Sequence, residues 1–123
     1  MTGAQYSSNS YGPKPGGGFH YGTDMFAATG TQERAVRAGN VTYATESAGG
    51  KVAYLYADDG NVYYYAHMSQ FQGSNRHVTT GAIIGLLGQT GNATAPHLHF
   101  EVRIGGVNGN RVDPYPILQA AHC

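Results

Sequence analysis

The clearest pattern along the chain is a strict alternation of polar and apolar residues from Pro96 to Ile104. Apolar side chains on one side are Leu98, Phe100, Val102 and Ile104, and polar side chains on the other are His97, His99, Glu101 and Arg103. This alternation predicts a half-buried strand whose polar face presents two imidazoles side by side. Such a pair can divide its work, one histidine binding a metal and the other transferring protons, although two surface histidines are the simpler alternative.

Other short runs favour strands as well. Residues 51–57 and 61–67 are rich in valine and tyrosine and flank Asp58-Asp59-Gly60, which predicts a β-hairpin;. The apolar run 82–88 is short enough for a buried strand, and no stretch shows a long helical period with caps;. The sequence predicts a single compact all-β domain of short antiparallel strands over residues 19–118, after a flexible arm (1–18) and before a tail (119–123).

Composition agrees with this class and excludes several partners. The chain has 123 residues, enough for one domain, with 19 glycines and 10 tyrosines;. Seven basic residues balance seven acidic ones, which argues against binding to nucleic acid or an anionic membrane;. The single cysteine, Cys123, cannot form an intrachain disulfide. The first nine residues do not read as a signal peptide, and no apolar run is long enough for a membrane span;.

A second motif, from His20 to Asp24, places two metal-ligand side chains close in sequence. On an extended strand both face the same side, and Gly22 between them is expected to leave space for a ligand. Imidazole nitrogen and carboxylate oxygen are both good zinc donors, but a catalytic site needs a third protein donor. His99 or His97 is the obvious source.

Taken in order, these motifs resemble those of a known enzyme family. The motifs are His20-x-x-x-Asp24, Tyr65-Ala66-His67-Met68-Ser69, Gly88-Gln89-Thr90-Gly91 and Pro96-His97-Leu98-His99-Phe100-Glu101. Their order and chemistry resemble the lysostaphin-type zinc metallopeptidases, also called LytM domains, over about residues 10–118. Two departures are Gln32-Glu33, where the family usually has proline and an apolar residue, and a short N-terminal segment, where family members build a wall of the substrate groove.

The resemblance implies a lysostaphin-like β-sandwich and a zinc endopeptidase acting on bacterial peptidoglycan. His20, Asp24 and His99 match the zinc ligands, whereas His67 and His97 match the catalytic histidines. Zinc would activate a water molecule, one histidine would accept its proton, and the other would stabilise the oxyanion; the sequence does not assign these two roles.

Two other residue groups have simpler interpretations. Glu101 lies too far along the strand to be the base and is expected to have a structural role, paired with Arg103 or with a neighbour on the next strand. The tyrosines of the hairpin are expected to pack in the sheet rather than bind carbohydrate. His77 and His122 are expected to be solvated.

Alternatives remain at the level of biology. The bond cut is a glycyl-glycine bond, a D-amino acid cross-link or another stem-peptide bond. The substrate that the resemblance implies predicts an extracellular location, at the cell wall or on a virion, for a secreted hydrolase, a bacteriocin or a phage lysin. A non-catalytic peptidoglycan-binding or structural domain of a phage tail or cell-wall protein is the alternative function; binding alone would not require the full set of five residues.

Overall fold

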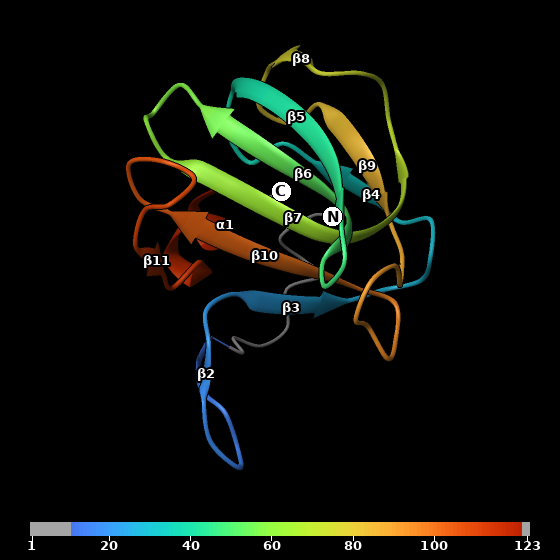
Figure 1. Ribbon diagram of the computed structural model, residues 1–123. Coiled ribbons are helices and arrows are strands. Elements are labelled where there is room, and N and C mark those ends of the chain that lie inside the picture. Colours follow the sequence, from blue (N-terminus) through green and yellow to red (C-terminus); the bar gives the residue numbers. More distant parts are fainter. Residues whose placement is uncertain (1–10, 122–123) are drawn as a thin grey trace.

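The computed structural model describes residues 11–121, which form short strands joined by turns, with one short helix near the C-terminal end (Figure 1). This confirms the predicted all-β class. Within the described residues, no helix is long and apolar enough to cross a membrane. The elements are β1 (Gly12–Pro13), β2 (Phe19–His20), β3 (Thr23–Phe26), β4 (Gln32–Arg34), β5 (Gly39–Glu46), β6 (Gly50–Ala57), β7 (Val62–Phe71), β8 (Arg76–Val78), β9 (Ile83–Leu87), β10 (His97–Arg103), β11 (Arg111–Val112) and α1 (Tyr115–Ala121).

Strand β10 has three partners in an antiparallel sheet. One edge of β10 pairs with β7, and the other pairs first with β3 and then with β11. The described residues place nine strands in this sheet, in the order β11-β10-β7-β6-β5-β8, with β9 joining β7 to β4. Strands β1 and β2 form a separate hairpin that projects from the sheet in Figure 1.

The sheet curls, because β9 pairs with the end of β7 and carries β4 on its other side (Figure 1), and residues of β5, β6, β7, β9 and β10 meet in one core. Alternate residues of β7 and β10 point into this core, and the residues between them point to the opposite face;. The larger buried members of the core are Leu55, Tyr63, Tyr65, Met68, Ile84, Leu87, Leu98, Phe100 and Val102. A smaller cluster of Val52, Tyr64 and Ala66 covers the opposite face of β6 and β7.

The structure confirms the predicted hairpin and corrects one end of β10. Strands β6 and β7 pair on either side of the 58–60 turn. Ile104, predicted to join the core, is instead 45% exposed. The reason is that β10 ends at Arg103 and the chain then turns into the loop 104–110.

The helix α1 was not predicted, although a local signal for its start was present. Asp113 accepts a hydrogen bond from the Tyr115 backbone N–H at 3.0 Å, and Pro114 follows it, which is a favoured arrangement at a helix start;. The helix has seven residues, too few for a repeating apolar period. It includes residues 119–121 of the predicted tail, whereas residues 1–10 of the predicted arm, His122 and Cys123 lie outside the described residues.

Candidate active site

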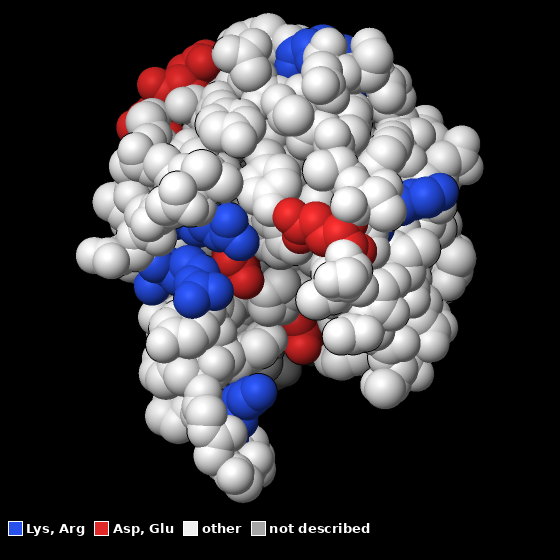
Figure 2. Space-filling model, viewed as in Figure 1, with Lys and Arg blue, Asp and Glu red and all other residues white. Residues whose placement is uncertain are grey.

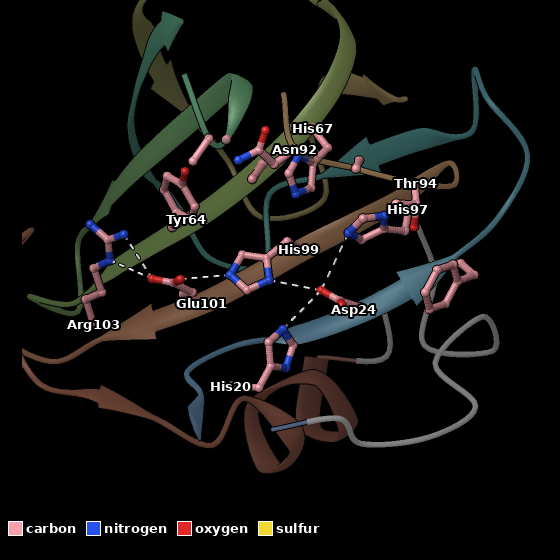
Figure 3. Close-up of a pocket in the computed structure, with 15 residues that line it drawn as sticks. His20, Asp24, Tyr64, His67, Asn92, Thr94, His97, His99, Glu101 and Arg103 are labelled. Carbon is pink, nitrogen blue, oxygen red and sulfur yellow. Dashed lines mark hydrogen bonds and ion pairs between the residues drawn. The ribbon is translucent and has the colours of Figure 1, made fainter. Parts of the chain in front are cut away.

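The polar face of β10 lines a pocket of about 490 Å³ (Figure 3). All five residues that the sequence analysis selected line it: His20, Asp24, His67, His97 and His99. The other lining residues are Phe26, Ala48, Gly49, Tyr64, Ala66, Asn92, Ala93, Thr94, Glu101 and Arg103. The pairing of β10 with β3 and β7 therefore gathers side chains from distant parts of the sequence.

The β3–β10 register brings Asp24 to the pocket. Asp24 lies directly opposite His99, so both side chains leave the same face of the sheet;. Asp24 Oδ1 lies 2.9 Å from His99 Nδ1, 3.4 Å from His20 Nε2 and 3.7 Å from His97 Nε2. The prediction that Gly22 leaves space for a ligand is wrong. The space beside it is filled, because a Cβ atom there would lie 2.7 Å from the His99 ring and 2.6 Å from the Phe100 carbonyl oxygen.

The donor atoms of His20, Asp24 and His99 fit a zinc ion. One donor from each residue lies within 4.8 Å of the other two. Donors bound to one tetrahedral zinc are about 3.4 Å apart, so the set needs little movement to close on a metal. Three protein donors leave one position for water or substrate, which is the pattern of a catalytic zinc site. The geometry favours His99 over His97 as the third donor.

The charges around His99 also favour a cation. Burial opposes protonation of His99, but hydrogen bonds to Asp24 and Glu101 outweigh it and raise the pKa of the ring to about 9. Burial likewise opposes ionisation of Asp24, yet the hydrogen bond and charge of His99 hold the pKa of this carboxyl below its usual range. Two carboxylates thus flank one imidazole, and a metal cation can replace the proton between His99 and Asp24.

His67 and His97 lie side by side in the pocket, with ring centroids 4.7 Å apart. His67 Nδ1 lies 2.7 Å from the Thr90 carbonyl oxygen, and His97 Nδ1 lies 2.8 Å from that of Ala95. Because a carbonyl oxygen only accepts, each Nδ1 donates, and in the neutral ring Nε2 is free to accept a proton. Burial lowers the pKa of His67 below its ordinary value, against a raising effect of the Thr90 carbonyl.

The backbone at His67 is strained. Its φ is +66°, and no other non-glycine residue in the described part of the chain has a positive φ. This conformation costs roughly 1–2 kcal/mol for a residue with a side chain. The His67 N–H donates to the Gly49 carbonyl at 2.8 Å, and this bond, with the Nδ1 bond to Thr90, fixes the ring in the pocket.

Two loops interlock to provide these partners of His67. The Thr90 hydroxyl donates to the Met68 carbonyl at 2.6 Å and accepts from the Lys51 N–H at 3.0 Å. The contact is tight at Gly91, whose φ is +73° and where a Cβ atom would lie 2.4 Å from the Ala48 carbonyl oxygen. The loop 88–96 and the turn between β5 and β6 therefore position His67 together.

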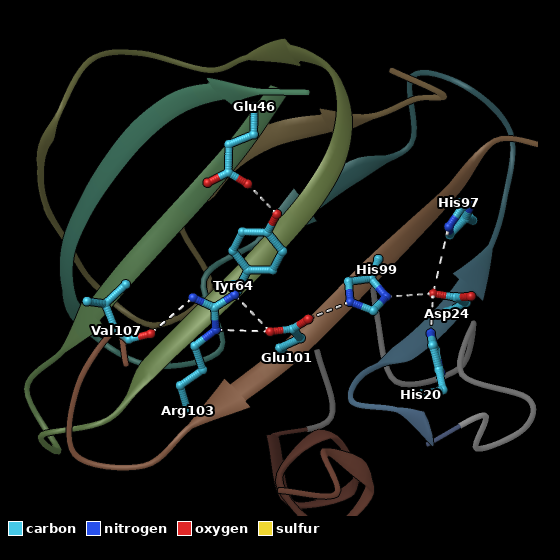
Figure 4. Close-up of polar contacts among 9 residues, drawn as sticks. All are labelled: His20, Asp24, Glu46, Tyr64, His97, His99, Glu101, Arg103 and Val107. Carbon is cyan, nitrogen blue, oxygen red and sulfur yellow. Dashed lines mark hydrogen bonds and ion pairs between the residues drawn. The ribbon is translucent and has the colours of Figure 1, made fainter. Parts of the chain in front are cut away.

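A chain of polar contacts runs from His99 along β10 (Figure 4). His99 Nε2 lies 2.8 Å from Glu101 Oε2, and Arg103 Nε donates to Glu101 Oε1 at 2.9 Å. Arg103 packs 4.5 Å from the ring centroid of Tyr64, whose hydroxyl donates to Glu46 at 2.7 Å. The predicted pairing of Glu101 with Arg103 is confirmed. Its contact with His99 was not predicted, and it orients the imidazole as carboxylates do beside metal-binding histidines.

The remaining predicted histidines and tyrosines have simple roles. His77 is exposed and lies 3.2 Å from Asp58, away from the pocket. Tyr63 and Tyr65 pack in the core as predicted, and Tyr64 packs with Val52 and Ala66 on the opposite face of the sheet, where it also lines the pocket. Thr90 belongs to the Gly88-Gln89-Thr90-Gly91 motif, but its contact with His67 was not predicted, and Asn92, which lines the pocket, was not among the predicted site residues.

The chain matches known peptidases in sequence. The model of peptidase family M23 matches residues 18–114. The chain is 40% identical over 119 residues to the glycyl-glycine endopeptidase ALE-1 of Staphylococcus capitis, a match that covers 90% of this chain and 33% of that protein. It is 37% identical over 99 residues to the DD-carboxypeptidase/endopeptidase Mpg of Neisseria meningitidis serogroup B, covering 80% of this chain and 22% of Mpg. The chain thus spans a third or less of the length of these relatives.

A solved structure supports the same relationship at the level of the fold. The catalytic domain of the antimicrobial peptidase lysostaphin from Staphylococcus simulans superposes with a TM-score of 0.82 and 36% sequence identity. The match covers 92% of this chain and 90% of that domain. The resemblance therefore extends over the whole β-sheet architecture.

Proposed function

Because the chain belongs to peptidase family M23, we propose that it is a zinc-dependent endopeptidase that hydrolyses peptide bonds in bacterial peptidoglycan. Its relatives include a glycyl-glycine endopeptidase and a DD-carboxypeptidase/endopeptidase. Glycyl-glycine bonds and D-amino acid cross-links are accordingly the two substrates to compare. Such a substrate implies action at the bacterial cell wall, outside the cell.

One observation carries this proposal: three metal donors and two further histidines converge in a single pocket (Figure 3). In the proposed roles, His20, Asp24 and His99 hold zinc, and His67 and His97 act in catalysis. Zinc, when bound, supplies Lewis acidity that polarises a carbonyl group and lowers the pKa of water.

The chain's own residues handle the proton transfers. Of His67 and His97, one acts as the neutral ring, accepts a proton at Nε2 and later donates it to the leaving amine, while the other acts with both ring nitrogens protonated and donates a hydrogen bond from Nε2 to the developing oxyanion. Both rings are held by their Nδ1 bonds to backbone carbonyls, so their Nε2 atoms are available for these roles. The 4.7 Å separation of the two rings allows both to reach one peptide group. Glu101 keeps His99 in the orientation that turns Nδ1 toward Asp24.

The non-catalytic alternative has no comparable support. A wall-binding domain has no need for three metal donors beside two further histidines, and the relatives reported above are named as peptidases. The comparisons likewise give no support to a place in a phage tail.

The direct test is a digest of two purified peptidoglycans, one with glycine cross-bridges and one with direct D-amino acid cross-links. New amino termini are identified by mass spectrometry with zinc, with a chelator, and after zinc is restored. We expect new termini that disappear with chelator and return with zinc. Asp24→Ala and His97→Ala should abolish them, whereas His77→Ala, which alters an exposed histidine outside the pocket, should not. Zinc-loaded protein that releases no amine from either wall would refute the proposal.

A further inference from the structure

A second, polar pocket of about 280 Å³ adjoins the end of the active-site pocket. Its lining residues are Arg103, Val107, Asn108, Gly109 and Arg111. Arg103 lines both pockets, so the two lie next to each other along β10. In Figure 2, basic side chains gather in the region of β10 and β11, beside an acidic one.

The two arginines of this pocket differ in their charge balance. Arg103 is paired with Glu101 at 2.9 Å, and its Nη1 donates to the Val107 carbonyl at 3.1 Å. Arg111 is exposed, and no carboxylate among the described residues lies within ion-pair distance of it. Within the described part of the chain, the pocket therefore carries one positive charge that no carboxylate pairs with, that of Arg111.

The guanidinium of Arg111 is nevertheless held in place. It lies 4.0 Å from the ring centroid of Tyr21, a partly exposed side chain next to His20. A guanidinium stacked on an aromatic ring keeps its N–H edge free for a planar, two-oxygen acceptor. Carboxylates and phosphates both match this edge with two parallel hydrogen bonds, and of the two a peptide carries a carboxylate.

The backbone spacing along β10 gives an approximate distance between this pocket and the metal donors. Arg111 pairs directly with Arg103, which is four residues beyond His99 on β10. At about 3.3 Å per residue this is roughly 13 Å, the length of about four residues of an extended peptide.

We propose that the pocket around Arg111 binds a carboxylate of the substrate peptide, about four residues from the bond that is cut. This inference rests on the proposed peptidase function and extends it to a class of substrate: peptides with an acidic group at that distance. Arg103 and Glu101 form the neutral connection between this subsite and the metal donors. Asn108 adds a side-chain amide to the pocket lining.

Binding can be tested without cleavage. Two peptides are titrated into zinc-loaded, ¹⁵N-labelled His97→Ala protein: acetyl-(Gly)₄-Glu-(Gly)₄-amide and the same peptide with glutamine. The side-chain Nε–H signal of Arg111, assigned by its loss in Arg111→Gln, should shift with the glutamate peptide and not with the glutamine peptide. Equal shifts with both, or no shift with either, would overturn the proposal.

Cleavage gives the second measurement. Peptides with a single glutamate or glutamine, placed two to six residues from the cleaved bond on either side, are compared by kcat/KM. Wild-type protein should prefer glutamate by about tenfold near the fourth position, mainly through KM, and Arg111→Gln should cleave the glutamate and glutamine peptides with equal kcat/KM. Tyr21→Phe should keep the preference, and Arg37→Gln, outside both pockets, should leave it intact.

The two measurements separate the two proposals. A shift specific to the glutamate peptide, with no cleavage of any peptide, would support the carboxylate site and count against the peptidase function. Cleavage without any preference for glutamate would support the peptidase function and count against the carboxylate site.

Discussion

At the scale of single residues, the positive φ of His67 allows a variant that removes the imidazole but still suits the backbone conformation. Asparagine tolerates this left-handed conformation better than most residues, so His67→Asn removes the ring while easing the strain;. We expect the melting temperature and the zinc content to stay close to those of the wild type. The peptidase rate should fall by about 10²- to 10⁴-fold, the usual contribution of a general acid–base group.

The measurements for this variant are the rate on peptidoglycan, zinc by atomic absorption, and thermal unfolding. His77→Asn is the control for loss of a histidine at an exposed position. A His67→Asn protein that cleaves at the wild-type rate would remove His67 from the mechanism.

Glu101 offers a second test at this scale, because it contacts His99 without being a proposed metal donor. Glu101→Gln keeps an acceptor for His99 but loses the charge that pairs with Arg103. Zinc affinity should fall by about 10- to 100-fold, the typical effect of changing a partner of a metal-binding histidine. Competition with a calibrated chelator measures this affinity.

Glu46→Gln is the matched control for this variant. It changes the carboxylate at the far end of the same polar chain, where it accepts from Tyr64. Equal zinc affinities for the two variants would mean that Glu101 does not support the metal site.

The five proposed catalytic and metal-binding residues could be selected from the sequence because their side chains are chemically demanding and fall in short motifs. Tyr64 could not, since tyrosine is ordinary in a β-rich chain, and the motif that contains Thr90 did not reveal its contact with His67. Their importance depends on which strand pairs with which, and on the register between them. Arg103 is an intermediate case, because the alternation of β10 placed it on the correct face without indicating a ligand.

At the scale of elements, the interlocked loops explain how a strained histidine is held. Gly91→Ala adds a methyl group that would lie 2.4 Å from the Ala48 carbonyl oxygen, so the two loops must separate. We expect a loss of more than about 2 kcal/mol in the free energy of unfolding and a reduced peptidase rate, with zinc retained. Thermal unfolding and zinc analysis test both points.

Gly60→Ala provides the control for this substitution. The φ of Gly60 is +90°, but an added Cβ atom would meet nothing within 4 Å. The substitution therefore strains the backbone without a steric clash. It should lose only about 1 kcal/mol and keep full activity. Similar behaviour of the two alanine variants would contradict a positioning role for the loop contact.

The strands were predictable where the alternation of polar and apolar residues ended at typical turn residues. Strands β6, β7 and β10 follow from alternation and from the 58–60 turn;. The end of β10 and the helix α1 did not follow, because both are decided by tertiary contacts over a few residues. Leu118, for example, anchors α1 in the core, which a seven-residue pattern cannot reveal.

At the scale of the whole molecule, Glu33 is a cost to stability. It is fully buried in β4, and among residues 11–121 neither of its carboxylate oxygens has a hydrogen-bond partner. Burial raises its pKa to about 8 from 4.5. This is the position at which the resembling family usually has an apolar residue, so the departure seen in the sequence has a clear physical consequence in the fold.

The sign of the pH dependence follows from proton binding. Below pH 4.5 both the folded and the unfolded state hold the proton of Glu33. Above that value the unfolded state releases it while the folded state retains it, so stability should fall as the pH rises toward 8;. Glu33→Gln should remove this slope, and Glu33→Leu should in addition raise the free energy of unfolding by about 1–3 kcal/mol.

Urea unfolding of the three proteins at pH 5 and pH 8 measures both effects. The wild type should lose stability relative to Glu33→Gln between the two values. If the difference between the two proteins were the same at both pH values, Glu33 would already be ionised in the folded protein.

The pairing of β3 with β10 has a further consequence for folding. Asp24 and His99 are 75 residues apart in the chain, so the metal donors meet only after most of the polypeptide has been drawn into a closed loop. A zinc ion held by both ends would act as a cross-link across that loop, comparable in entropy to a disulfide and worth up to about 4 kcal/mol. The unfolded chain does not bring these donors together, so metal binding indicates that β3 has paired with β10. Chelation should accordingly loosen first the N-terminal strands β2 and β3, which carry His20 and Asp24, and leave the β5–β7 sheet in place;.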